Sequence, residues 1–456
     1  MRAVPSLAAL ALLAAAPALA TGFDEPVFPA VLEGHAVLPA LTLVAPPEDA
    51  PRDAWISGKF ATRTGRRVDR PMSVEGNTGG LHGRRGSGVF LPFIGQPLQG
   101  LSGFAMERAA DGSIHVLIDN GFGSKRNSPD ALLSFTRMAP DFDTGEVELV
   151  EQVWLRDPNR VIPFRIAYGG TQERYLTGAD FDPESLQVIG DTVWIGEEFG
   201  PFLISATLDG VVTGVYPTLA GEAELRSPDH PAVVVPAEAG RDWRVPRSGG
   251  YEGMALQPGT GLLWAMLEKP ILGEDGAPEG RFLRVMAFDP EAREWTSQAF
   301  KFPLAEGATA IGDFNFIDET RALVIERDNG EGDPSLACEG APRPDCFPNP
   351  ARLKRVVLID TASIDEQGVV RRIGHVDLMD IQDPNGLARL ETDAARDLTG
   401  RFTLPFFTIE DVMLAAEGRI LVAVDNNLPF SSGRKLDAAM DSEFVLLAVE
   451  ELLAAR

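Results

Sequence analysis

The amino-acid sequence predicts an all-β fold: a single β-propeller with inserted loops and six blades, within a range of five to seven. Two observations lead to this prediction. Hydrophobic residues make up 44% of the chain and occur mainly in short runs, separated by turns that 46 Gly and 35 Pro supply. In addition, one hairpin-like pattern recurs five times along the chain, without the spacing of amphipathic helices.

The recurring pattern has a polar start, a short apolar run, a turn signal and a second, stronger apolar run. Short runs with Gly or Asp between them are typical of β-hairpins. The five segments are residues 101–123, 182–202, 251–270, 311–330 and 409–430. Their polar starts are 61 to 97 residues apart, the length of a hairpin plus further strands. This spacing predicts one propeller blade for each repeat.

The two ends of the chain are expected to complete a sixth blade together. Residues 23–60 would supply part of it, and the C-terminal strand EFVLLAVEEL would supply the rest. Closing a ring with strands from both termini is an economical solution. The propeller is therefore expected to occupy residues 21–456 as one domain.

Acidic residues recur at two positions of the repeated hairpin. The first strands begin at Ser102, Glu184, Glu252, Asp313 and Glu410. The second strands close at Asp119, Glu197 or Glu198, Glu268, Glu326 and Asp425. Each pair is 13 to 17 residues apart, enough for two strands and a turn, so both positions lie at the same end of the hairpin. In a propeller that end faces the channel mouth, which predicts a ring of carboxylates there.

A ring of like charges favours a bound cation. Hard oxygen ligands with almost no His or Cys indicate Ca²⁺, with Mg²⁺ as the second choice. The predicted metal ligands are Asp119, Glu184, Glu198, Glu252, Asp313, Glu326, Glu410 and Asp425. The alternative is that these residues only cap turns, as Asp and Asn often do at strand ends. Recurrence in five repeats, with Glu at three of the five starts, favours the metal site.

Cationic residues follow the closing acid in several repeats: Lys125 with Arg126, Lys269, Arg327, and Arg434 with Lys435. A carboxylate-held metal beside such cations suits the hydrolysis of phosphate esters, in which charge on the transferring group must be balanced. The predicted catalytic residues are Glu184, Glu252, Lys125 and Arg327. The alternative is that these cations form surface salt bridges, each of which contributes little stability.

Motifs of the repeats also carry a family resemblance. In order, they are GLSG before DNGFG, DPES before GEEFGPF, YEGMAL, VIERDNG, and IEDV before VDNN, within residues 95–450. As a set they resemble the phytase-like family, also described as "esterase-like activity of phytase". The resemblance implies a secreted propeller and calcium-dependent phosphate-ester hydrolysis. The sequence departs from the family's usual Glu-Gly with Glu-Ser at 184–185, Gly-Asp at 312–313 and Glu-Asp at 410–411, which bears on the number of metals.

Charge and missing motifs narrow the function. The formal net charge of −26 opposes binding to nucleic acid and to anionic membranes, which both need a basic surface. There is no GxSxG, HExxH, GxxxxGK[ST] or GxGxxG motif, and His115 lies in an apolar strand as a core histidine would. The expected partner is a small phosphate ester or another anionic ester, bound by a monomer without membrane insertion.

Three functions remain open. The first is a metal-dependent phosphomonoesterase or phosphodiesterase. The second is a metal-dependent propeller lactonase or carboxylesterase, which would use a similar ring of acidic and amide ligands. The third is a non-catalytic propeller that binds a ligand or protein and holds a structural metal.

Two further segments carry expectations. Cys338 and Cys346 are the only cysteines and lie in a Pro-rich loop, so a disulfide is expected in an exported chain. Residues 57–88 carry seven Lys or Arg against two acidic residues. This basic segment is interpreted as an insertion loop, either simply solvated or folded over the mouth as an anion-binding lid.

The first twenty residues have the features of a secretory signal peptide. Arg2 precedes an Ala- and Leu-rich centre that ends in Ala-Leu-Ala, and no Cys follows to accept a lipid. We therefore predict cleavage after Ala20 and a soluble periplasmic or extracellular product. Intact-mass measurement of exported protein should give the chain beginning at Thr21. Exported material that retains residues 1–20 would contradict the prediction.

Overall fold

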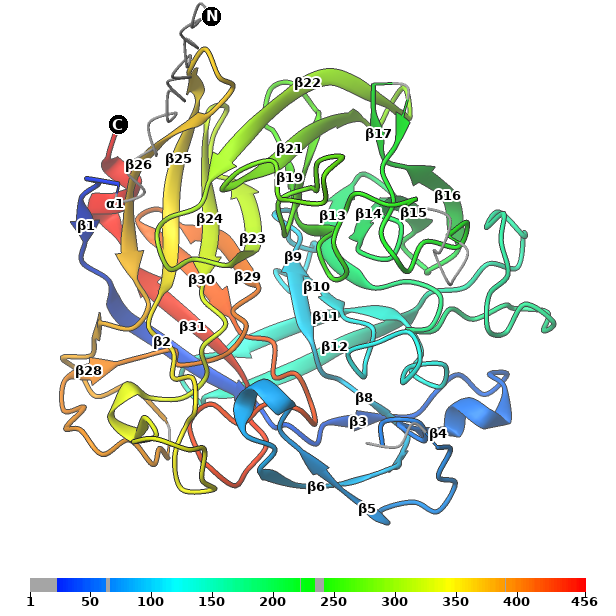
Figure 1. Cartoon of the computed structure of the whole chain (residues 1–456), viewed down its shortest axis with the longest axis horizontal. Helices are drawn as coiled ribbons and strands as arrows, with labels where there is room; N and C mark the ends of the chain where they lie inside the picture. The colour runs from blue at the N-terminus through cyan, green and yellow to red at the C-terminus, as the bar shows by residue number, and fades with distance from the viewer. Residues whose placement is uncertain (1–22, 63–65, 222, 234–241, 390) are drawn as a thin grey trace, which may run out of the picture.

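The computed structural model describes residues 23–62, 66–221, 223–233, 242–389 and 391–456 (Figure 1). The predicted signal peptide, residues 1–20, lies outside this part of the chain. Nearly all regular structure is β-strand, and α1 (Glu450–Ala454) is the one α-helix among the described residues. No described helix is long and apolar enough to cross a membrane.

Strand pairing among the described residues gives five four-stranded blades, so the fold is a β-propeller. Blade 1 contains β9 (Leu101–Phe104), β10 (Ile114–Ile118), β11 (Ser134–Asp141) and β12 (Glu146–Trp154). Blade 2 contains β13 (Pro183–Ile189), β14 (Thr192–Glu197), β15 (Phe202–Thr207) and β16 (Val212–Pro217). Blade 3 contains β19 (Tyr251–Leu256), β20 (Leu263–Leu267), β21 (Phe282–Asp289) and β22 (Glu294–Pro303).

Blade 4 contains β23 (Ala310–Phe316), β24 (Arg321–Arg327), β25 (Lys354–Ile364) and β26 (Val370–Asp377), with β1 (Val27–Phe28) added at its outer edge. Blade 5 contains β29 (Asp411–Ala416), β30 (Arg419–Ala423), β31 (Ser442–Ala448) and β2 (Val31–Leu38). Each predicted hairpin is thus the inner half of a blade.

The predicted count of six blades is not confirmed. The terminal segments meet as expected, because β2 pairs antiparallel with β31, but they complete blade 5 instead of forming a further blade. Figure 1 shows the blue β2 beside the red β31. The physical reason is that the hairpin of β29 and β30 has only one following strand of its own, so its outer edge is free to pair with β2.

The inner strands close the ring. β9, β13, β19, β23 and β29 lie side by side in this order, and β29 contacts β9. Five apolar clusters hold the blades together, and each draws its buried residues from two neighbouring blades. In the cluster between blades 3 and 4, for example, Phe300 and Phe302 pack with Phe314 and Phe316. The hydrophobic core is therefore divided among the blade interfaces.

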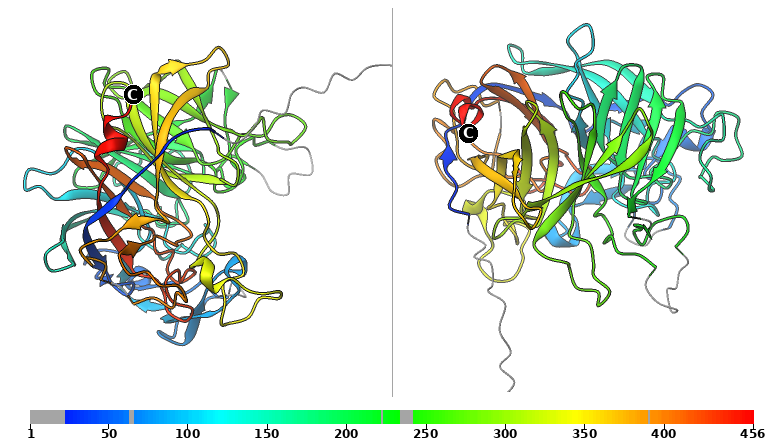
Figure 2. Two further views of the ribbon diagram at one scale, coloured as in Figure 1. Left: turned by 90° about the vertical axis from the view of Figure 1, so that its left-hand side faces the viewer. Right: turned by 90° about the horizontal axis from the view of Figure 1, so that it is seen from above.

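Short elements decorate the ring. They are β3 (Leu43–Val44), β4 (Ile56–Ser57), β5 (Val74–Asn77), β6 (Gly86–Leu91), β7 (Phe93–Ile94), β8 (Gln96–Pro97), β17 (Leu219–Ala220), β18 (Ala223–Glu224), β27 (Ile381–Gln382) and β28 (Arg401–Phe402), with 3-10 turns η1 (Arg52–Trp55), η2 (Gly80–His82) and η3 (Pro334–Leu336). The longer loops follow the second strand of a blade, as in blade 4 (residues 328–353), or the fourth strand, as between blades 1 and 2 (residues 155–182). Figure 2 shows them gathered on one side of the ring, with residues 328–353 in yellow.

That long loop contains the predicted disulfide. The bond between Cys338 and Cys346 is present, with 4.9 Å between their Cα atoms, and it follows η3. The disulfide prediction is therefore confirmed.

The basic segment is better ordered than a simple solvated loop. It contains β5, η2 and β6, and two of its cations are buried in ion pairs. Lys59 Nζ lies 3.4 Å from Asp130 Oδ2, and Arg85 Nη2 lies 3.2 Å from Glu331 Oε1. These charges are therefore engaged within the protein.

Two buried amides span the channel between the blades. The Gln187 side chain of β13 donates to Asn315 Oδ1 of β23 at 2.8 Å and to Met254 O of β19 at 2.8 Å, and it accepts from Met106 N at 3.2 Å. Asn315 Nδ2 donates in turn to Val412 O of β29 at 2.9 Å and to Phe104 O of β9 at 3.4 Å. This amide pair therefore joins all five blades.

We predict that Asn315→Leu lowers the free energy of unfolding by about 3–5 kcal/mol, because several buried partners lose their hydrogen bonds. Urea unfolding followed by circular dichroism measures the change. Gln298→Leu, an exposed amide on β22, is the control and should change it by less than about 0.5 kcal/mol. Equal effects of the two substitutions would show that the amide pair does not hold the ring.

Candidate functional site

A cavity of about 250 Å³ lies where the second strands end. Eight carboxyl groups and two cationic side chains line it, together with neutral groups such as Asn120, Ser248, Asn329, Phe407 and Thr408. The carboxyl groups belong to Asp119, Asp182, Glu184, Glu198, Glu252, Glu268, Glu410 and Asp425, and the cations are Lys269 and Arg327. Most of these side chains are buried, so the charges face each other with little water between them.

β-bulges set the direction of the carboxylates at the starts of the inner strands. In blade 2 the pairs Pro183–Glu197 and Ser185–Gly196 leave Glu184 without a partner on β14. In blade 3 the pairs Tyr251–Leu267 and Gly253–Met266 leave out Glu252 in the same way. A bulge re-aims the side chain of its extra residue. Both glutamates therefore face the cavity while the strands on either side keep their pairing.

The other carboxylates come mainly from the ends of the second strands. Asp119, Glu198, Glu268 and Asp425 follow β10, β14, β20 and β30 at equivalent places in four blades. In blade 4 the equivalent place is occupied by Arg327, the last residue of β24. The residue at this place is thus acidic in blades 1, 2, 3 and 5 and cationic in blade 4.

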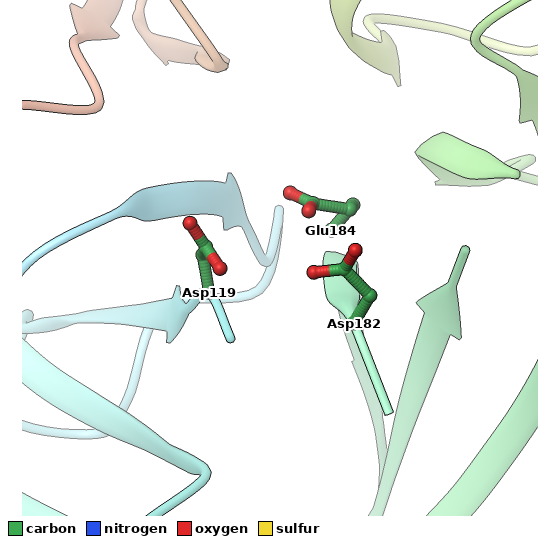
Figure 3. Close-up of side chains that lie close together, drawn as sticks. All are labelled: Asp119, Asp182 and Glu184. Carbon is green, nitrogen blue, oxygen red and sulfur yellow. The ribbon is translucent and has the colours of Figure 1, made fainter. Parts of the chain in front are cut away.

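The first carboxylate cluster consists of Asp119, Asp182 and Glu184. One oxygen from each lies within 4.8 Å of the others, and Figure 3 shows the side chains converging from the end of β10 and the start of β13. Asn120 Nδ2 donates to Asp182, and the Gly121 N–H donates to Asp119 at 3.1 Å. In the described chain these three carboxylates form no ion pair with Lys or Arg, so the oxygens are suited to a bound cation.

The second carboxylate cluster consists of Glu198, Glu252 and Glu268. Their nearest oxygens also lie within 4.8 Å of one another. Here, however, Arg327 Nη2 lies 3.3 Å from Glu252 Oε1 and 2.9 Å from Glu268 Oε1. Lys269 Nζ adds a second contact, 2.7 Å from Glu268 Oε2. This cluster therefore already holds protein cations.

Burial, and for several groups the charge of neighbouring acids, shifts the pKa values of these carboxyl groups upward. Burial, and then the charges of Asp182 and Asp425, hold the pKa of Asp119 well above its ordinary value. Burial, and then Asp119 and Asp182, do the same to the pKa of Glu184. Burial raises the pKa of Asp182 to about 7 and that of Asp425 to about 6, although hydrogen bonds to both carboxylates oppose the shift. These surroundings thus favour the protonated form of the carboxyl groups.

Six of the eight predicted metal ligands line this cavity: Asp119, Glu184, Glu198, Glu252, Glu410 and Asp425. The structure places the other two elsewhere. Asp313 accepts hydrogen bonds from the backbone N–H groups of Phe314 at 2.6 Å and Val412 at 2.8 Å, and so links blades 4 and 5. Gly312 stands before it, and a side chain there would meet Ile409 O at 1.8 Å, so blade 4 has no room for an entry carboxylate.

Glu326 lies on the other face of β24 from Arg327, because successive residues of a strand point to opposite sides. Its carboxylate accepts from Arg372 Nη2 at 3.0 Å and from Ala305 N at 2.7 Å, away from the cavity. The inward residue of blade 4 is therefore Arg327, and the prediction of Glu326 is wrong by one position.

The predicted catalytic residues Glu184, Glu252 and Arg327 line the cavity. Lys125 does not, since its Nζ donates to Asp229 O at 2.9 Å and lies over the Phe199 ring. Sequence reasoning also left Asp182 and Glu268 out of the metal set. The signal was present, because Glu268 closes a repeat and Asp182 stands two residues before Glu184.

Comparisons with known proteins give a family match over most of the chain. The model of the phytase-like family, described as "Esterase-like activity of phytase", matches residues 96–428. No curated protein sequence is significantly similar to the chain.

Solved structures show only distant similarity. A glutaminyl cyclase from Myxococcus xanthus is 10% identical over 77% of this chain and 92% of its own, with a TM-score of 0.35. An arabinanase from Bacillus subtilis is 9% identical over 76% and 93%, with a TM-score of 0.34. A protein of unknown function from Dyadobacter fermentans is 10% identical over 77% and 95%, with a TM-score of 0.38. At these values none of them informs the chemistry of the site.

The raised pKa values predict how stability depends on pH without metal. The pKa of Asp182 rises from 3.8 to about 7 on folding, so between these values the folded protein binds more protons than the unfolded chain. Stability should therefore fall as pH rises through this window, on the order of 2–4 kcal/mol for such a group. Urea unfolding in EDTA between about pH 5 and 8 measures the slope.

Asp182→Asn should reduce this slope, because asparagine does not titrate. An unfolding free energy that increases from pH 5 to 8 in EDTA would contradict the assignment of these carboxyl groups to a crowded, desolvated cavity.

Proposed function

This chain belongs to the phytase-like family, and from that membership and the carboxylate-lined cavity we propose that it is an exported, metal-dependent hydrolase of phosphate esters. Export is supported by the N-terminal sequence, residues 1–20. Hydrolysis is supported by the family and by a cavity that combines oxygen ligands with fixed cations.

One observation carries the proposal: Asp119, Asp182 and Glu184 converge, and within the described chain no Lys or Arg forms an ion pair with them. Eight carboxyl groups and two cations line the cavity, so an anionic ester would be repelled unless more positive charge entered with it. A divalent cation supplies that charge. The donors are all oxygens, which suits Ca²⁺ and, less well, Mg²⁺ with its strict octahedral geometry.

The residues present therefore fit a calcium ion, held by Asp119, Asp182 and Glu184. When bound, such an ion polarises a phosphoryl oxygen and lowers the pKa of water. Burial first, and then the charge of neighbouring acids, raises the pKa values of Asp119 and Glu184, and the charge of a bound cation would oppose that second effect.

The chain's own residues then bind and orient the substrate. Lys269 and Arg327 line the same cavity beside the second carboxylate cluster and would attract the anionic group of the ester. Asp425 lines the same cavity, and a pKa of about 6 suits it to accept or hold a proton near neutral pH. The Phe407 ring, over which the Arg327 guanidinium lies at 5.5 Å, covers that cation from one side.

We predict that Ca²⁺ stabilises the protein and supports ester hydrolysis. At one hundred times its Kd, Ca²⁺ should add about 2.7 kcal/mol to the free energy of unfolding by mass action. Glu184→Gln should bind Ca²⁺ at least about tenfold more weakly, because one charged ligand is lost from a site of three. Isothermal titration calorimetry and thermal unfolding with and without EDTA measure both effects, and Glu148→Gln, an exposed position on β12, is the control.

Substrate class is tested with the wild-type protein and Ca²⁺. Turnover of p-nitrophenyl phosphate or bis-p-nitrophenyl phosphate, lost in EDTA and in Glu184→Gln, is expected. Turnover of a simple lactone alone would replace phosphate esters by carboxylic esters as the substrate. Tight Ca²⁺ binding without turnover of any ester would identify a binding protein, and the absence of any Ca²⁺ effect would remove the metal from the proposal.

A further inference from the structure

We propose that Arg327 takes the place of a second metal ion, so that the channel mouth binds one divalent cation, at the first carboxylate cluster only. This inference rests on the proposed function, because it concerns how many cations that site accepts. Two clusters of three carboxylates lie at the mouth, and in each the ligand oxygens lie within 4.8 Å of one another.

Arg327 stands in the ring at a place where the other four blades carry an acidic residue. The places that follow the second strands carry Asp119, Glu198, Glu268 and Asp425 in four blades, and Arg327 in blade 4. The guanidinium therefore occupies the same level as the carboxylates and points into their midst. It is 3% exposed, so its charge is not dispersed by water.

Arg327 contacts three carboxylates through one nitrogen atom. Its Nη2 lies 2.9 Å from Glu268 Oε1, 3.3 Å from Glu252 Oε1 and 3.4 Å from Glu410 Oε1. One nitrogen thus touches carboxylates from two other blades, as a multidentate metal ion would.

The other nitrogen atoms of the Arg327 guanidinium are also bonded within the protein. Its Nε donates to Ile311 O at 3.1 Å, and its Nη1 donates to Asn329 Oδ1 at 3.2 Å. The Phe407 ring covers the guanidinium at 5.5 Å. A side chain bonded in this way does not leave the cluster to make room for an ion.

The first carboxylate cluster differs from the second in its partners. Asn120 donates to Asp182 and the Gly121 N–H donates to Asp119, and in the described residues no ion pair to Lys or Arg reaches these two groups or Glu184. Entry of Ca²⁺ at the second cluster would bring it against Arg327 and Lys269, whereas the first cluster presents no such repulsion. One mouth thus combines one exchangeable cation with one permanent cation.

The experiment is a count of bound Ca²⁺ per chain, by equilibrium dialysis with metal analysis and by calorimetry, with Ca²⁺ alone as the probe. Wild type should bind one ion. Arg327→Gln should bind two, because the Glu252, Glu268 and Glu410 carboxylates then lack the cation that they share. Ca²⁺ should also raise the melting temperature of this variant by more than that of wild type.

Arg372→Gln is the matched control. Arg372 is also a buried arginine, paired with Glu326 at 3.0 Å and Glu25 at 2.7 Å, but it lies away from the cavity. It should bind one ion as wild type does. Arg327→Lys keeps the charge and should also stay at one.

A pair of variants decides the matter even if Arg327→Gln does not fold. Glu184→Gln should lose Ca²⁺ binding by at least about tenfold, and Glu252→Gln should keep it within about threefold. Two ions in wild type, one ion in folded Arg327→Gln, or equal losses in the two glutamate variants would each overturn the role of Arg327 while leaving the proposed function intact. No ion in wild type would overturn the proposed function itself.

Discussion

The hydrogen bond between the amides of Gln187 and Asn315 is the contact on which the ring depends. It joins inner strands that are not neighbours, and each amide also bonds to the backbones of other blades. A slip of one inner strand would break several of these buried bonds together, and each unpaired group would be destabilising. Glu184 lies three residues before Gln187 on the same strand, so the contact that sets the ring also sets the spacing of the carboxylates.

A stable ring is needed because the crowded carboxyl groups at the mouth destabilise the folded state. Its carboxyl groups are buried beside one another, and their pKa values rise as a result. Five apolar blade interfaces and the amide pair supply the stability that offsets this repulsion. Functional sites commonly combine such local destabilisation with a scaffold that is stable elsewhere. The bulges at Glu184 and Glu252 show the same division, since irregular backbone occurs where side chains must be aimed and regular pairing follows.

Local patterns in the sequence were enough to predict the propeller, the hairpins and most of the acidic ring, because each depends on residues close together in the chain. The errors lie where the outcome depends on distant partners. Asp313 was assigned to the mouth because nothing local shows that Ile409 crowds the place before it. The pairing of Gln187 with Asn315, 128 residues away, leaves no periodic trace. The predicted sixth blade is absent from the described residues for a similar reason. Only the pairing of β2 with β31 reveals which hairpin lacked an outer strand.

The mouth has an approximate fivefold repetition of acidic residues, and blade 4 departs from it with Arg327. The charge around the cavity is therefore asymmetric. The first carboxylate cluster has no ion pair with Lys or Arg in the described part of the chain, whereas carboxylates of the second cluster are tied to Arg327 and Lys269. Five identical acidic blades would attract cations equally from every side and would leave an anionic ester no fixed orientation. With one blade cationic, the proposed ester would be drawn toward Arg327 and Lys269, while the proposed cation would be held at the first carboxylate cluster. A single change of sign at one strand end therefore suffices to turn a symmetric ring of ligands into an asymmetric site, which is what orientation of a substrate requires.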